Sequence, residues 1–222
     1  IAGTAQAHAS ATAHAAATVQ IQATATATVA GTLQASYDQI THSLPILKDP
    51  LTAAGTNNWD TTTGCSFTNG AYHVISTQKG LITPCFAQAS NFSDFAYQVQ
   101  MSVSKGDYGG IVFRADAKNT KLYLFRVGQD GSYNLYYYPD GTGTNTKVLA
   151  AGSSTLILQG LNMTNQIAVI ARGATINLYI NGKYLTSVSD PTLKAGEIGV
   201  IADDTSNPTE VVYSQAQVWN LQ

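Results

Sequence analysis

The chain has 222 residues, which is enough for one large β domain or two small ones, and only 11% of them are charged. Its formal net charge is -2, so it lacks the clustered Lys and Arg that nucleic acids and anionic membrane surfaces require, and both are excluded as partners. No segment approaches the ~20 consecutive apolar residues of a membrane span, which excludes direct membrane insertion by this chain.

Residues 1–45 form an Ala- and Thr-rich stalk. From Ala5 to Val29 the odd positions hold Ala, Val or Ile, and nearly all even positions hold Gln, His, Ser or Thr. A period of two suits a strand, but this run is too long for a strand of a compact domain, and Ala has the highest helix propensity. No proline occurs before Pro45. We therefore predict a helix over residues 4 to about 43, with a disordered spacer as the alternative, and expect self-association through its small-residue faces.

Two cysteines, Cys65 and Cys85, flank an alternating apolar run. One even pair suits a single disulfide, which would contribute on the order of 3 kcal/mol and would persist only in an oxidising compartment. The alternative is a pair of buried free thiols in a cytosolic protein.

From residue 46 onward the pattern is typical of β-strands. Apolar and polar residues alternate from Phe95 to Val103, as in a half-buried strand. Further short β-rich runs cover Ile111 to Ala115, Leu122 to Val127, Tyr133 to Tyr138, Ile167 to Arg172, Ile176 to Ile180, Tyr184 to Val188, Ile198 to Ala202 and Val211 to Trp219.

Two dipeptides predict tight hairpins between these runs. Asp130-Gly131 and Asn181-Gly182 both suit the positive φ angles of tight hairpins. With no helical period between the strands, the pattern predicts one all-β domain over residues 46–222, built as a sandwich of two antiparallel sheets.

The order of several motifs resembles the concanavalin A-like lectin/glucanase superfamily, and most closely its laminin-G-like and 3-keto-disaccharide-hydrolase-type domains. The resemblance rests on Phe95-Ala-Tyr-Gln-Val-Gln-Met, Gly109-Gly-Ile-Val-Phe-Arg, Leu122-Tyr-Leu-Phe-Arg-Val, Ile176-Asn-Leu-Tyr-Ile-Asn-Gly-Lys, Gly196-Glu-Ile-Gly-Val and Val212-Tyr-Ser-Gln-Ala-Gln-Val-Trp. It implies a jelly-roll sandwich in which one curved sheet offers a groove.

The stalk adds a second resemblance. Ala/Thr/Gln repeats that lead into such a domain are similar to the extracellular half of some bacterial membrane serine/threonine kinases. This resemblance implies a sensor domain at the cell surface or outside the cell, tethered by a membrane span upstream of Ile1.

Strand parity assigns candidate ligand-binding residues, because alternate side chains point to opposite faces of a sheet. If the large apolar residues enter the core, one outward face collects Arg, Gln, Asn and Tyr, a composition suited to a carbohydrate or another small ligand. The candidates are Gln98, Gln100, Arg114, Arg126, Asn134, Tyr136 and Tyr138.

Arg114 and Arg126 are expected to lie side by side on paired strands. Like charges in this position are destabilising unless an acidic group lies between them, so an acidic sugar or a protein carboxylate is expected there. In the alternative interpretation, Asp107 or Asp116 neutralises the arginines and the tyrosines only cover the sheet.

Asp203 and Asp204 follow the strand-like run Ile198 to Ala202. Acids in such loops often hold calcium in the superfamily, so calcium is the one cofactor considered. The alternative is that the pair only caps a turn.

Catalytic carboxylates are scarce, since the chain has only two glutamates, Glu197 and Glu210. Glycoside hydrolysis needs two carboxyl groups across the scissile bond, and the Glu-x-Asp-x-Glu array of the superfamily's glucanases is absent. We therefore predict a non-catalytic extracellular domain that binds carbohydrate. The alternatives are a glycoside-hydrolase-like enzyme that acts on a disaccharide or glucan, and a structural or oligomerisation module.

Overall fold

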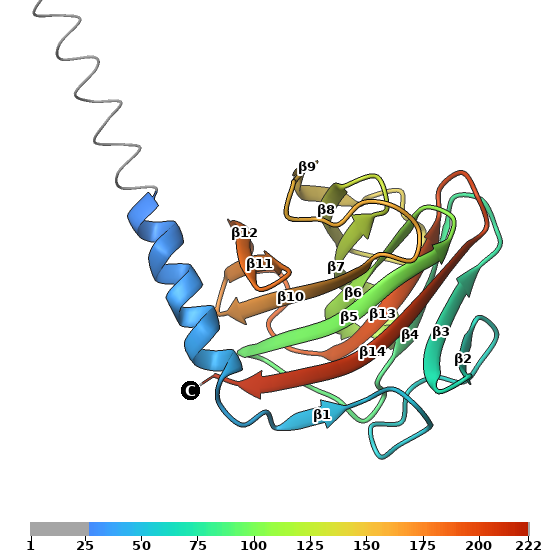
Figure 1. Cartoon of the computed structure of the whole chain (residues 1–222), viewed down its shortest axis with the longest axis horizontal. Helices are drawn as coiled ribbons and strands as arrows, with labels where there is room; N and C mark the ends of the chain where they lie inside the picture. Colours follow the sequence, from blue (N-terminus) through green and yellow to red (C-terminus); the bar gives the residue numbers. More distant parts are fainter. Residues whose placement is uncertain (1–26, 222) are drawn as a thin grey trace, which may run out of the picture.

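The computed structural model describes residues 27–221 (Figure 1). The predicted helix therefore falls partly outside the described residues, which contain its last part as a helix over residues 27–41, called the N-terminal helix below. No helix in the described part of the chain is long and apolar enough to cross a membrane.

The rest of the described chain forms a β-sandwich of two antiparallel sheets, as predicted (Figure 1). One sheet has eight strands in the order β12-β11-β10-β5-β14-β3-β2, with β1 paired to β14, and the other has six in the order β4-β13-β6-β7-β8-β9. The strands are β1 (Leu47–Asp49), β2 (Cys65–Thr68), β3 (Ala71–Ser76), β4 (Leu81–Phe86), β5 (Phe95–Lys105), β6 (Tyr108–Asp116), β7 (Lys121–Gly128), β8 (Ser132–Tyr138), β9 (Lys147–Ser153), β10 (Thr164–Arg172), β11 (Thr175–Ile180), β12 (Lys183–Ser189), β13 (Glu197–Asp204) and β14 (Thr209–Asn220). A short 3-10 helix, η1 (Ala117–Asn119), joins β6 to β7.

Alternation of apolar residues places the core between the two sheets. On β5 the side chains of Val99, Met101 and Val103 are buried there, and on β6 those of Ile111 and Phe113 face them from the other sheet. Both predicted hairpins are confirmed, because β7 pairs with β8 around the Asp-Gly turn and β11 pairs with β12 around the Asn-Gly turn.

The N-terminal helix packs on the outer face of the eight-stranded sheet. Tyr37 is only 4% exposed and stacks on Tyr179, with 4.5 Å between the ring centroids. Gln34 donates to the carbonyl of Gly182 and accepts from the backbone N–H of Tyr184, each at 2.8 Å. The described end of the stalk is therefore part of the folded sandwich.

A disulfide joins the two sheets. Cys65 on β2 belongs to the eight-stranded sheet and Cys85 on β4 to the six-stranded sheet, and the two residues are bonded as predicted. The bond closes a loop with a sequence separation of 20 residues, and a structural disulfide is typical of proteins in an oxidising compartment.

Removal of this disulfide is expected to lower the stability without changing the fold. In Cys65→Ala/Cys85→Ala, the unfolded chain regains the entropy of an open loop, so the free energy of unfolding should fall by about 3 kcal/mol. Urea titration followed by tryptophan fluorescence measures the change, and equal unfolding midpoints for wild type and variant would contradict it.

Candidate functional site

A groove with a volume of about 700 Å³ lies on the outer face of the six-stranded sheet. Its deepest side chains, Val112, Leu124 and Ile201, come from β6, β7 and β13 and are almost completely buried. A second layer of partly buried side chains packs on them and lines the open groove: Ile82, Phe86, Leu122, Tyr136 and Tyr138. The volume is within the range of small-molecule sites in proteins.

The loop between β8 and β9 forms one wall of the groove. Asp140 accepts hydrogen bonds from the backbone N–H of Thr142 at 2.9 Å and from its hydroxyl at 2.5 Å, and a further one from Asn145. These bonds, led by that of the Thr142 hydroxyl, lower the pKa of Asp140, so its carboxylate is ionised at neutral pH. The wall is therefore rich in hydroxyl groups, and the hydrogen bonds of Asp140 fix its conformation.

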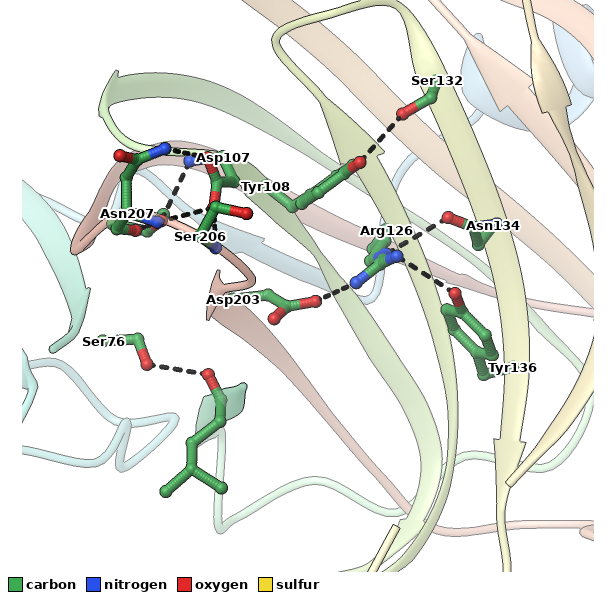
Figure 2. A network of polar contacts seen from close by, with 12 residues as sticks. Ser76, Asp107, Tyr108, Arg126, Ser132, Asn134, Tyr136, Asp203, Ser206 and Asn207 are labelled. Atoms are coloured by element: carbon green, nitrogen blue, oxygen red, sulfur yellow. Dashed lines mark hydrogen bonds and ion pairs between the residues drawn. The ribbon is translucent and has the colours of Figure 1, made fainter. Parts of the chain in front are cut away.

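Arg126 lies on β7 next to the groove and holds a network across several strands (Figure 2). Its Nε donates to Asn134 Oδ1 at 3.2 Å and its Nη2 to the Tyr136 hydroxyl at 3.1 Å, while its Nη1 forms an ion pair with Asp203 on β13. The guanidinium also lies over the ring of Tyr108, 4.2 Å from the ring centroid.

A glycine on the neighbouring strand makes room for this network. Gly110 on β6 is directly opposite Arg126, and a Cβ atom at this position would lie 2.5 Å from the Phe125 carbonyl oxygen and 2.8 Å from Arg126 Cα. Any larger residue would therefore push β6 away from β7 where the guanidinium is held.

Burial dominates the titration of the groups around Arg126. It raises the pKa of Asp203, and the adjacent guanidinium offsets this only in part. It also lowers the pKa of Arg126, but the hydrogen bond and charge of Asp203 more than compensate, so the net shift is upward. Burial raises the pKa of Tyr138 to about 12, so its hydroxyl remains protonated at neutral pH.

Four of the predicted site residues are brought together. Arg126, Asn134 and Tyr136 are in direct contact through the hydrogen bonds above, and the ring of Tyr138 lies beside that of Tyr136, with 5.9 Å between their centroids. Strand parity therefore predicted correctly that these side chains of β7 and β8 lie on one outer face of the sandwich.

The expectation that Arg114 shares this face is wrong. Its side chain is completely buried and donates to the backbone carbonyls of Ser93, Gly173 and Leu193 and to the carboxylate of Asp94. A β-bulge between Phe113 and Asp116 shifts the register, and the φ angle of Arg114 is +47°. The side chain therefore points toward the loops whose carbonyl groups it binds. The predicted Arg114–Arg126 pair does not form.

Gln98 and Gln100 point outward as predicted, but from the other sheet. Both lie on β5 of the eight-stranded sheet, where Gln98 accepts from the Tyr37 hydroxyl at 2.8 Å and donates to Gln217 at 2.8 Å. Gln100 accepts from the Ser214 hydroxyl at 3.4 Å. The two amides therefore support the face that carries the N-terminal helix and do not reach the groove.

The structure does not bring together Asp203 and Asp204, the pair considered from the sequence as a calcium site. Successive residues of β13 point to opposite faces, so Asp203 pairs with Arg126 while Asp204 is directed to the inner side. There its Oδ1 has no hydrogen-bond partner among the residues that the structure describes. Over residues 27–221, no group of three His, Cys, Asp or Glu side chains is placed to hold a metal.

Asp107, a proposed partner of the arginines, instead holds the turn between β13 and β14 (Figure 2). Its carboxylate accepts from the backbone N–H groups of Ser206 and Asn207 and from the Asn207 side chain. Partial burial acts to raise the pKa of Asp107, but these hydrogen bonds outweigh it and lower the pKa. Arg114 and Arg126 instead pair with Asp94 and Asp203, neither of which was considered from the sequence as a partner of an arginine.

Glu197 begins β13 on the same outward row as Ile201 and Asp203. Burial raises the pKa of Glu197, and the nearby charges of Asp60 and Asp116 raise it further. One of its carboxylate oxygens, Oε2, is buried without a hydrogen-bond partner in the described part of the chain. The strand therefore carries a carboxyl with a raised pKa at its start and an ion-paired carboxyl near its end.

Comparison with known proteins shows similarity in structure alone, since neither a family model nor a curated protein matches the chain. A carbohydrate-binding module from Bacillus subtilis superposes with a TM-score of 0.62 at 17% identity, covering 73% of this chain and 95% of the module. A β-glucanase from Bacillus licheniformis superposes with a TM-score of 0.56 at 12% identity, covering 79% of this chain and 98% of the glucanase. An endo-β-1,3-glucanase from Pyrococcus furiosus superposes with a TM-score of 0.58 at 10% identity, covering 79% of this chain and 94% of that enzyme.

The chain has a concanavalin A-like jelly-roll fold. A carbohydrate-binding module and two glucanases share this fold, and identities this low show the fold alone. The functional assignment must therefore come from the groove itself.

The Arg126–Asp203 pair gives a stability prediction. Arg126→Met or Asp203→Asn alone leaves one buried charge without its partner, so each should lower the free energy of unfolding by about 3 kcal/mol. The double variant Arg126→Met/Asp203→Asn should lose clearly less than the sum, as measured by urea unfolding at pH 7. Additive losses would show that the two groups do not stabilise each other.

Proposed function

We propose that this chain is a non-catalytic carbohydrate-binding domain that acts outside the cell, and that the groove on the six-stranded sheet is its binding site. The observation that carries the proposal is the pair Tyr136 and Tyr138, which line an open groove next to a fixed hydrogen-bonding network. Aromatic rings of this kind present an apolar surface to a sugar ring while their hydroxyls remain polar.

Two further observations support the proposal. The fold is shared with a carbohydrate-binding module over 95% of that module's length, and the disulfide suits an oxidising compartment. The Arg126 network holds Asn134 and Tyr136 in fixed positions, which reduces the entropy lost when a ligand binds.

Tyr138→Ala is expected to weaken glycan binding about fivefold, because stacking on an aromatic ring contributes on the order of 1 kcal/mol. Wild type is first screened on a glycan array, and its best ligand is then titrated by calorimetry. Tyr138→Phe should retain most of the affinity, since it keeps the ring.

Tyr184→Ala is the matched control, because Tyr184 is a partly buried tyrosine on the other sheet, next to the N-terminal helix. Thermal unfolding checks that each variant is folded. Equal affinities for Tyr138→Ala and wild type would place the ligand elsewhere.

Glycoside hydrolysis is the second candidate function. The observation that favours it is Glu197, whose Oε2 is buried without a hydrogen-bond partner in the described part of the chain and whose pKa is raised by burial, the direction that a general acid requires. We expect no turnover of β-glucans or 3-keto-disaccharides by wild type. Turnover that is lost in Glu197→Gln and kept in Glu210→Gln would instead identify an enzyme. Glu210 is a suitable control because it pairs with His73 on the other sheet.

A sensor role in a bacterial membrane serine/threonine kinase stays a prediction that rests on the resemblance of the stalk. Sequencing the gene upstream of the codon for Ile1 would test it, since a membrane span and a kinase domain encoded there are what the prediction requires.

A further inference from the structure

The groove combines two kinds of surface. Its floor is aliphatic and comes from several strands, with Ile82 on β4, Val112 on β6, Leu122 on β7 and Ile201 on β13. Its wall is the loop from Asp140 to Thr146, which carries hydroxyl groups. A ligand that fills the groove therefore meets hydrocarbon on one side and hydrogen-bonding groups on another.

The groove has no basic side chain. Among the described residues that line it, Asp140 carries the one formal charge, which is negative. Arg126 lies next to it but is neutralised by Asp203 and bonded to Asn134 and Tyr136. The acidic sugar considered from the sequence would therefore meet no positive charge among the described side chains that line the groove, and a neutral ligand is favoured.

The aliphatic floor also selects among neutral sugars. A hydroxyl group placed against Ile82 and Leu122 would lose its hydrogen bonds to water and find no replacement among hydrocarbon side chains. A methyl group in the same place would instead gain by leaving water. Ordinary hexoses carry a hydroxyl on the exocyclic carbon, whereas 6-deoxyhexoses carry a methyl group there.

We propose that the groove binds a neutral glycan that contains a 6-deoxyhexose, with the methyl group on the aliphatic floor and the ring hydroxyls toward the Asp140–Thr146 wall. This inference rests on the proposed carbohydrate-binding function and specifies the sugar class. The wall loop is ordered by the hydrogen bonds of Asp140, so the hydroxyl-binding side is formed before the ligand arrives.

Matched sugar pairs test the proposal directly. Methyl α-L-fucopyranoside and methyl α-L-galactopyranoside differ by one hydroxyl group, as do methyl α-L-rhamnopyranoside and methyl α-L-mannopyranoside. Calorimetric titration of the wild-type chain should give about tenfold or greater preference for the deoxy member of at least one pair. In nuclear magnetic resonance spectra, the sugar methyl protons should show cross-relaxation to Ile and Leu methyl groups of the protein.

Ile82→Thr replaces the ethyl group of this floor side chain with a hydroxyl and should reduce this preference to about threefold or less. Ile75→Thr makes the same change on β3 of the other sheet, where Ile75 is 38% exposed, and should keep the wild-type preference. Circular dichroism checks that each variant is folded. If Ile82→Thr is unfolded, the affinities of wild type for the matched sugar pairs and the cross-relaxation in wild type test the proposal without it.

The outcomes separate the two proposals. Equal or stronger binding of both fully hydroxylated sugars, with binding still lost in Tyr138→Ala, overturns the deoxy-sugar inference and leaves carbohydrate binding intact. An unchanged preference in folded Ile82→Thr also overturns it, because the methyl group would then lie elsewhere. Absence of binding to every glycan on an array that includes fucosylated and rhamnosylated chains overturns both proposals.

Discussion

Each strand that buries one row of side chains between the two sheets must turn its alternate row outward, and in this chain both outward rows contain apolar residues. The sandwich therefore has two outer faces that need cover. On the eight-stranded sheet, the N-terminal helix supplies it through Tyr37 and Ile40. On the six-stranded sheet, partly buried side chains cover Leu124 and Ile201 but leave a groove. The candidate site is the part of an apolar outer face that the chain does not cover with its own backbone.

The positive charge beside the groove is neutralised by a carboxylate of the protein itself. Arg126 is paired with Asp203, and the remaining contacts of its guanidinium go to neutral groups such as Asn134 and Tyr136. Such a pair adds little net stability relative to apolar residues, but breaking it exposes the full cost of one buried charge. Its structural effect is to join β13, β7 and β8 beside the groove, so that the tyrosines are held in place.

Most of the fold could be predicted from the sequence because long strands alternate regularly and two hairpins carry Asp-Gly and Asn-Gly turns. The short strands β1, β2 and β4 and the small-residue strand β9 were not predicted, since their sequences contain few alternating apolar residues. Arg114 was misplaced because parity fails at a bulge, and nothing in the local sequence marks that bulge. Gln98 and Gln100 show a different limit, because alternation separates inside from outside but does not say which sheet a strand joins. The partnership of Arg126 with Asp203 could have been suspected, since Asp203 continues the outward row of Ile201.

The position of the N-terminal helix has a practical consequence for the orientation of the domain. The helix packs on one outer face of the sandwich, where Leu221 near the end of the chain also packs, and Figure 1 shows the marked C-terminus beside it. The groove opens on the opposite outer face. A domain immobilised on a solid support through the face that carries the N-terminal helix would therefore present its groove away from the support, where it can capture glycans that arrive from solution or from another surface.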